Sequence, residues 1–167
     1  FASYPDNVVC MRFISTSEMT IEAKFNLSHD GKTTVDDNEI TVEGELEDNQ
    51  LKFNGKMVVV VKDGKVKKKA NSLLIVDSTD VAFFVSAATD YNNSYPVYRT
   101  GETAEELDKR VQSVIEKAVL KGYEKVKESH LTDYCSIFDR VKIDIGQETP
   151  QITTDELLST YKSHFTE

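Results

Sequence analysis

The sequence predicts a mainly β fold that ends in helices: an antiparallel β-sandwich followed by a helical linker. Two observations predict it. Over residues 1–91, short apolar runs alternate with turn signals, and apolar and polar residues alternate within a run, which is the period of a half-buried strand. After about residue 100 the apolar residues recur every three or four positions, which is the period of a helix facing a core.

The strands are predicted one by one from this alternation. Residues 20–25 show it plainly, because Ile21, Ala23 and Phe25 alternate with polar neighbours. Asp63-Gly64 is a frequent two-residue turn, so we expect a hairpin there. Residues 81–85 are apolar on both faces, which places them centrally in a sheet or between layers. The predicted strands are 8–13, 20–25, 39–46, 50–62, 65–70, 71–78 and 80–91.

Helix signals fill the second part of the chain. Thr103 and Glu106 have the spacing of a capping box, and an apolar stripe follows from Leu107 to Val119, with Gly122 as its expected end. A second stripe runs from Tyr123 to Val141. Residues 141–146 return to a period of two and are predicted as a strand. A capping-box spacing at 153–156 then opens a short third helix.

Composition and charge exclude some classes of protein. The 167 residues carry a formal net charge of −9, whereas a general binder of nucleic acid or of anionic membranes needs a basic surface. No apolar run is long enough to span a bilayer. The chain begins at Phe1 and not at Met, and its localisation, secreted or cytoplasmic, stays open.

Cysteine and histidine spacing indicates no metal site. Cys10 and Cys135 are expected to be buried free thiols, although a disulfide stays open. His29, His130 and His164 are scattered, so we expect them to bind no metal, and we expect His130 to make a structural hydrogen bond. No cofactor is implied.

No catalytic motif stands out, but one loop is a candidate binding site. It contains Tyr91, Asn92, Tyr95, Tyr98 and Arg99. Aromatic faces stack on sugars and amides bond to hydroxyl groups, so the cluster is a candidate for substrate binding. The alternative, which we prefer on sequence alone, is that the tyrosines pack the corner between strand and helix. A lysine-rich segment, residues 62–69, is interpreted as a solvated hairpin that protects a sheet edge.

Four stretches carry a family resemblance. In chain order they are FASYPDNVVCMRF (1–13), SLLIVDSTDVAFFVSAATDY (72–91), GYEKVKESHLTDYCSIFDRVKIDIG (122–146) and TTDELLSTYK (153–162). Together they resemble the N-terminal, supersandwich-like domain and following linker of glycoside hydrolase family 95, the α-L-fucosidases acting on α-1,2-linked fucose. The same domain type is similar to the N-terminal domain of family 65 enzymes.

The resemblance implies a division of the chain. Residues 1–100 would be the β-sandwich domain without its first strands, and 101–167 a helical linker toward an (α/α)6 catalytic barrel. The stripe over 131–141 would then pack between sandwich and barrel. The family's catalytic glutamate and aspartate belong to the barrel, beyond Glu167, so the resemblance assigns no catalytic residue to this chain.

Two functions from different classes follow as hypotheses. In the first, the chain is the non-catalytic domain and linker of an inverting glycoside hydrolase that removes terminal α-1,2-linked L-fucose. Its partners would be the enzyme's own helical catalytic domain and, through the enzyme, an oligosaccharide or glycan. In the alternative, the chain is a free-standing carbohydrate-binding or structural β-sandwich module that recognises glycans through the 91–99 loop.

Overall fold

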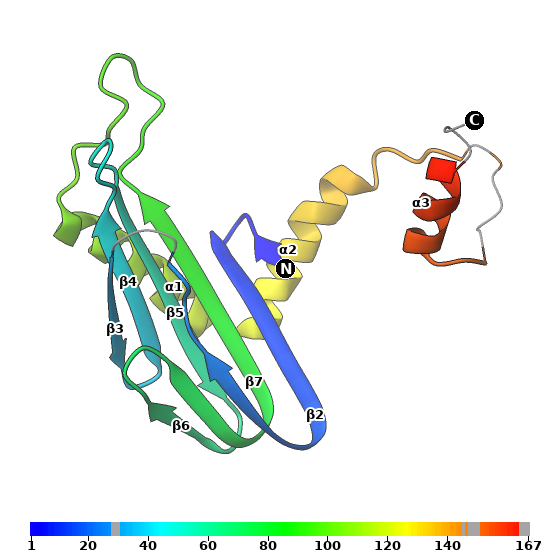
Figure 1. Cartoon of the computed structure of the whole chain (residues 1–167), viewed down its shortest axis with the longest axis horizontal. Helices are drawn as coiled ribbons and strands as arrows, with labels where there is room; N and C mark the ends of the chain where they lie inside the picture. Colours follow the sequence, from blue (N-terminus) through cyan, green and yellow to red (C-terminus); the bar gives the residue numbers. More distant parts are fainter. Residues whose placement is uncertain (28–30, 145, 147–150, 164–167) are drawn as a thin grey trace. The chain divides into compact units, whose positions relative to one another are not determined.

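The residues that the structure describes fold as one antiparallel sheet followed by three helices, which confirms the mainly β prediction (Figure 1). A computed structural model describes residues 1–27, 31–144, 146 and 151–163. In the described residues the sheet order is β1-β2-β7-β5-β4-β3, with β6 paired to β7. The strands are β1 (Ala2–Ser3), β2 (Val8–Ala23), β3 (Lys32–Asp36), β4 (Glu39–Glu45), β5 (Lys52–Val61), β6 (Lys65–Lys68) and β7 (Leu73–Thr89). The helices are α1 (Ala104–Lys121), α2 (Tyr123–Phe138) and α3 (Thr154–Ser163).

Two strands are much longer than predicted. β2 and β7 run for 16 and 17 residues and pair along their length, from Val9 opposite Val85 to Ala23 opposite Leu73. The register shifts between Ile14 and Ile21, and Asp77 has a positive φ of 57°. The polar residues that suggested chain breaks therefore lie at a bend inside continuous strands, which a β-bulge permits.

The predicted hairpin at Asp63-Gly64 is wrong. β5 pairs antiparallel with residues 81–89 of β7, and β6 pairs antiparallel with residues 73–76 of the same strand. The chain therefore keeps its direction through Gly64 and turns back only at 69–72, where the Lys69 N–H donates to the carbonyl oxygen of Ser72 at 2.9 Å. Asp63 and Gly64 lie at a bend between β5 and β6. The Asp63 carboxylate accepts hydrogen bonds from Ser78 and Thr79, at the bend of β7.

The bend folds the sheet over its own core. Leu73 and Ile75, which precede the bend of β7, are fully buried in one apolar cluster with Val81 and Phe83, which follow it. Lys68 of β6 and Asp36 of β3, two strands that are not paired in the sheet, form an ion pair of 2.9 Å. Across the described residues, the layers of the predicted sandwich come from one bent sheet and not from two separate sheets.

Helix α1 covers the other face of the sheet. The predicted capping box is confirmed: the Glu106 N–H donates to Thr103 Oγ1, and the Thr103 N–H donates to Glu106 Oε2. The stripe that it opens is buried at Leu107, Val111, Ile115 and Ala118. Ile115 and Ala118 pack in one cluster with residues of β2, β5 and β7, namely Val8, Cys10, Val58, Ala82 and Phe84. Gly122 ends the helix, as predicted.

The chain divides into two compact units, residues 1–136 and 137–167. The first holds the sheet, α1 and most of α2. The second holds α3, before which the Thr153 N–H donates to Glu156 Oε2 at 3.1 Å, in keeping with the predicted cap. Residues 141–144 form no strand, so the strand prediction is wrong there, and Ile145 lies outside the described residues. No described helix is long and apolar enough to cross a membrane.

Candidate functional site

The five residues predicted to bind a sugar lie together on one loop. The loop joins β7 to α1 and projects from the end of the sheet, at the top of Figure 1. An antiparallel bridge between Tyr91 and Arg99 closes its base. Inside it, the Asn92 N–H donates to the carbonyl oxygen of Tyr98 at 3.3 Å, and the Tyr98 N–H donates to that of Ser94 at 2.9 Å.

The tyrosines of this loop face solvent. Tyr95 is 84% exposed, Tyr91 53% and Tyr98 40%, and their neighbour Val97 is 69% exposed. The rings of Tyr95 and Tyr98 meet edge to face with centroids 6.3 Å apart. These side chains therefore contribute little to packing the corner between strand and helix, and they leave aromatic faces available to a ligand.

A buried carboxylate anchors the base of the loop. Asp90 is only 3% exposed and lies between two cations, Lys52 and Arg99, each with a nitrogen 3.6 Å from a carboxylate oxygen. Its Oδ1 also accepts from the Lys52 N–H at 3.0 Å. Arg99 in turn donates through Nη2 to the carbonyl oxygen of Asn49 at 2.8 Å. The loop is thus tied to β5 and to the turn before it.

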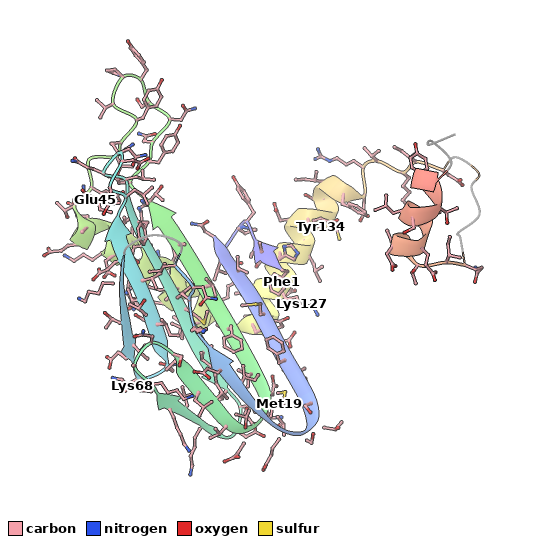
Figure 2. All side chains as sticks on the ribbon, in the orientation of Figure 1. Phe1, Met19, Glu45, Lys68, Lys127 and Tyr134 are labelled. Atoms are coloured by element: carbon pink, nitrogen blue, oxygen red, sulfur yellow. The ribbon has the colours of Figure 1, made fainter. Side chains whose placement is uncertain are left out.

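Lys52 is a lining residue of two separate hollows. The first, about 400 Å³, is lined by residues that include Asp90, Val97 and Arg99. The second, about 510 Å³, lies between the ends of β4 and β5 and the start of α1, with Lys52 and Glu45 among its lining residues. Figure 2 shows Glu45 near the base of the projecting loop and Lys68 toward the opposite end of the sheet.

A buried polar network lies beneath α1. Lys56 is 5% exposed and forms ion pairs with Asp108 of α1 at 2.9 Å and with Glu39 of β4 at 3.2 Å. Burial alone would lower the pKa of Lys56, but its bonds to these two carboxylates outweigh burial and raise the pKa. Next to it, Asn54 Nδ2 donates to Asp108 at 3.1 Å, while its buried Oδ1 has no hydrogen-bond partner among the described residues.

A third hollow, about 380 Å³, lies where α1 meets α2. Arg12 lines it, and the guanidinium of Arg12 already has carboxylate partners. Arg12 bonds Asp80 through two nitrogens, at 2.8 and 2.7 Å, and also bonds Glu124. Its guanidinium lies 5.2 Å from the centre of the Tyr123 ring. These bonds hold the pKa of Asp80 below its ordinary value. The arrangement stabilises the helix junction and leaves Arg12 little capacity for a ligand.

The histidine and cysteine predictions have mixed outcomes. His130 stacks between Phe1, at 4.9 Å, and Tyr134, at 5.8 Å, so the structure shows a role in ring packing. Cys10 is a buried free thiol whose burial raises its pKa to about 11. Cys135 is free but exposed, which corrects the prediction that both thiols are buried.

No group of three potential ligands for a metal ion occurs among the described residues. His29 and His164, which the metal prediction also weighed, lie outside them.

Sequence reasoning did not find the polar residues that surround the loop. Lys52 and Asn54 occupy ordinary positions of β5 and Asp90 directly follows β7, and only the pairing of β5 with β7 brings Lys52 and Asp90 together. The one available signal was position, because Asp90 immediately precedes the tyrosine-rich segment. Lys56 carried a second weak signal, since it is a lysine directly before the apolar run 57–61.

A family model decides the classification. The model described as "Glycosyl hydrolase family 65, N-terminal domain" matches residues 1–94, more than half of the chain. The chain belongs to this family. The family 65 N-terminal domain therefore includes the whole bent sheet and the first residues of the projecting loop, up to residue 94, and the resemblance to family 65 enzymes is confirmed at this level.

A solved structure supports the fold. A protein from the human microbiome, named as a kojibiose phosphorylase, matches with a TM-score of 0.58 and 8% sequence identity. The match covers 83% of this chain and 20% of that chain, so the family 65 N-terminal domain described here spans about a fifth of the matched protein. No curated protein matches. At this identity the structural match shows the fold alone.

Proposed function

We propose that this family 65 N-terminal domain is the non-catalytic part of a larger carbohydrate-active enzyme, whose chemistry is performed in a helical catalytic domain. In this proposal residues 1–100 form the β domain and 101–167 the linker toward the catalytic domain. Family membership supports the proposal. So does the state of the buried Lys56, because its ammonium group is held in ion pairs with Asp108 and Glu39 and is not poised for acid–base catalysis.

One observation carries the docking part of the proposal. Val126 and Ile137 of α2 are eleven residues apart and therefore on the same helix face. Val126 is fully buried against the sheet, whereas Ile137 is 62% exposed. Leu131 lies on another face of α2, since five residues turn a helix by about 140°, and it is 46% exposed there. Exposed aliphatic side chains along a helix indicate an interaction surface. We propose the enzyme's own helical domain as the partner of this surface.

The substrate is a finer proposal. The motifs at 1–13 and 122–146 resemble those of family 95, so we propose terminal α-1,2-linked L-fucose as the group that the enzyme removes. The second candidate is an α-linked glucose disaccharide such as kojibiose, which the name of the matched phosphorylase suggests. In either case this chain alone is expected to convert neither substrate.

The test uses the complete gene product and the 167-residue chain side by side. Release of fucose from 2′-fucosyllactose and phosphorolysis of kojibiose are measured for both. We expect activity on one substrate from the complete product and none from the chain alone. Turnover by the chain alone would contradict the assignment of a non-catalytic domain.

A matched pair of variants tests docking. Leu131→Glu should leave the melting temperature of the isolated chain unchanged but lower the activity of the complete enzyme by about tenfold or more, because a charge would be buried at the interface. Leu120→Glu is the control, because Leu120 is 90% exposed on α1. Equal behaviour of the two variants in the complete enzyme would overturn the proposed surface.

A further inference from the structure

We propose that the projecting loop and the hollow at its base form a binding site for a neutral oligosaccharide. The site consists of the exposed tyrosines Tyr91, Tyr95 and Tyr98 and of the polar group Asp90, Lys52 and Arg99. It goes beyond the architectural role proposed above. It uses residues remote from α2, so either proposal can fail while the other holds.

The tyrosines supply the stacking surface. Three aromatic rings and Val97 lie within eight residues, and two of the four side chains are more than 65% exposed. The hydrogen bonds inside the loop and the bridge at its base fix the backbone that presents them. A fixed, exposed aromatic surface loses little entropy on binding and suits the apolar face of a sugar ring.

The charges at the base favour a neutral, hydroxyl-rich ligand. The side-chain carboxylate of Asp90 accepts hydrogen bonds only, while the side chains of Lys52 and Arg99 only donate them, and each of the two cations has a nitrogen 3.6 Å from a carboxylate oxygen of Asp90. A sugar hydroxyl both donates and accepts, so neighbouring hydroxyls can bond the carboxylate and a cation together. The carboxylate of Asp90 would repel a simple anion, and the positive charges of Lys52 and Arg99 would repel a simple cation. Both are therefore disfavoured.

The size of the site fits the same ligand. The hollow that Asp90, Val97 and Arg99 line has a volume of about 400 Å³, within the range of small-ligand sites. The net charge of −9 disfavours nucleic acid and other polyanions. A short saccharide chain could place one ring in the hollow and a second against the tyrosines.

The test is titration calorimetry on the 167-residue chain with 2′-fucosyllactose, lactose and maltotetraose. We expect saturable binding of at least one of them. Tyr95→Ala should weaken it by about tenfold, and Tyr95→Phe should preserve it, because stacking needs the ring and not the hydroxyl. The control is Tyr4→Ala, since Tyr4 is 86% exposed on the turn between β1 and β2.

Two results would overturn the proposal: flat titrations with all three sugars, or equal loss of affinity in Tyr95→Ala and Tyr4→Ala. Tyr95 is 84% exposed, so the variant is expected to fold, and unchanged thermal unfolding verifies this. Neither result bears on docking through α2, which is tested by activity of the complete enzyme.

Discussion

At the residue scale, Lys56 holds the sheet to α1 by charge. Its ammonium group is the shared partner of Asp108 on the helix and Glu39 on β4, and it also donates to Thr41 Oγ1 at 3.1 Å. A carboxylate that loses such a partner in a poorly hydrated position is destabilising, more so than the ion pair itself is stabilising.

Lys56→Ala should therefore lower the free energy of unfolding by about 2–3 kcal/mol, less than for a fully buried pair because the Asp108 and Glu39 side chains are 36% and 25% exposed. Lys32→Ala is the matched control. Its 3.5 Å pair with Glu43 involves a 73% exposed lysine and should be worth under about 0.5 kcal/mol. Urea unfolding measures both, and equal values for the two variants would contradict this role of Lys56.

Asp63 stabilises the bend through its carboxylate. It accepts from Thr79 Oγ1 at 2.6 Å, from the Thr79 N–H at 2.7 Å and from Ser78 Oγ at 3.0 Å. The bonds from Thr79 are the main reason that the pKa of Asp63 lies below its ordinary value of 3.8. A lowered pKa means that folding favours the carboxylate, so its contribution is present above 3.8 and is lost as the pH falls through the folded value.

The expected result for Asp63→Asn is a stability deficit relative to the natural chain near pH 7 that shrinks below about pH 4. Urea midpoints at several pH values measure the difference. Acids with a lowered pKa that do not interact with Asp63, such as Glu102, act equally in both proteins and cancel in the comparison. A deficit that stays constant with pH would show that the charge of Asp63 is not the source of its contribution.

Residue-scale prediction from the sequence was uneven for a physical reason. Tyr95 and Arg99 belong to a short cluster in the sequence, and residues that are close in sequence remain close in the folded chain. Asp90 and Lys52 are 38 residues apart and meet only through strand pairing, which no local pattern specifies. Cys135 was misplaced because an apolar stripe indicates which helix face is apolar, not whether a partner covers it.

At the scale of elements, the bend across β2, β5–β6 and β7 shapes the fold. Alternation predicted most strand segments correctly, but it could not show that 8–13 and 20–25 are one strand, or that 71–78 and 80–91 are one strand. Polar residues at a bulge resemble those at a turn. β3 was missed because its five residues bury little on either face.

Gly64 gives the bend a direct test. It has a φ of +77°, and a Cβ atom there would lie 2.4 Å from the carbonyl oxygen of Val76. Gly64→Ala should therefore destabilise the chain by about 2 kcal/mol or more. Gly101 has a similar φ of +81° but no atom within 4 Å of the added carbon, so Gly101→Ala should cost only about 1 kcal/mol of backbone strain.

Thermal or urea unfolding of the two glycine variants separates the cost of the steric clash with Val76 from the cost of backbone strain at a positive φ. Equal destabilisation would mean that backbone conformation alone sets the requirement for glycine at position 64. In that case the close approach of β7 to the bend would contribute nothing to stability.

At the scale of the whole molecule, the sheet and α1 form a core that is complete on its helical side, where Leu107, Val111 and Ile115 are buried. The helices beyond Gly122 differ, because Leu131 and Ile137 of α2 and Leu158 of α3 remain 46% to 62% exposed. This contrast between a covered first helix and exposed later apolar side chains is the physical basis for proposing a partner domain.

The fold class and the family 65 relation were predictable from the sequence, because strand alternation and ordered motifs are properties of the chain itself. The substrate was not. Specificity depends on the walls of a catalytic pocket, and the carboxylates and tyrosines of this chain do not define one. The relation to α-L-fucosidases therefore stays a proposal that activity on 2′-fucosyllactose must decide.

The most direct test of the central claim, that this is the N-terminal domain of a larger enzyme, is the mass of the native gene product in its source cells. An immunoblot or intact mass spectrum measures it. The account predicts a product several-fold heavier than the 18.8 kDa of this chain. A mature product near 18.8 kDa would contradict it, and the loop at 91–99 would then become the leading candidate for the protein's function.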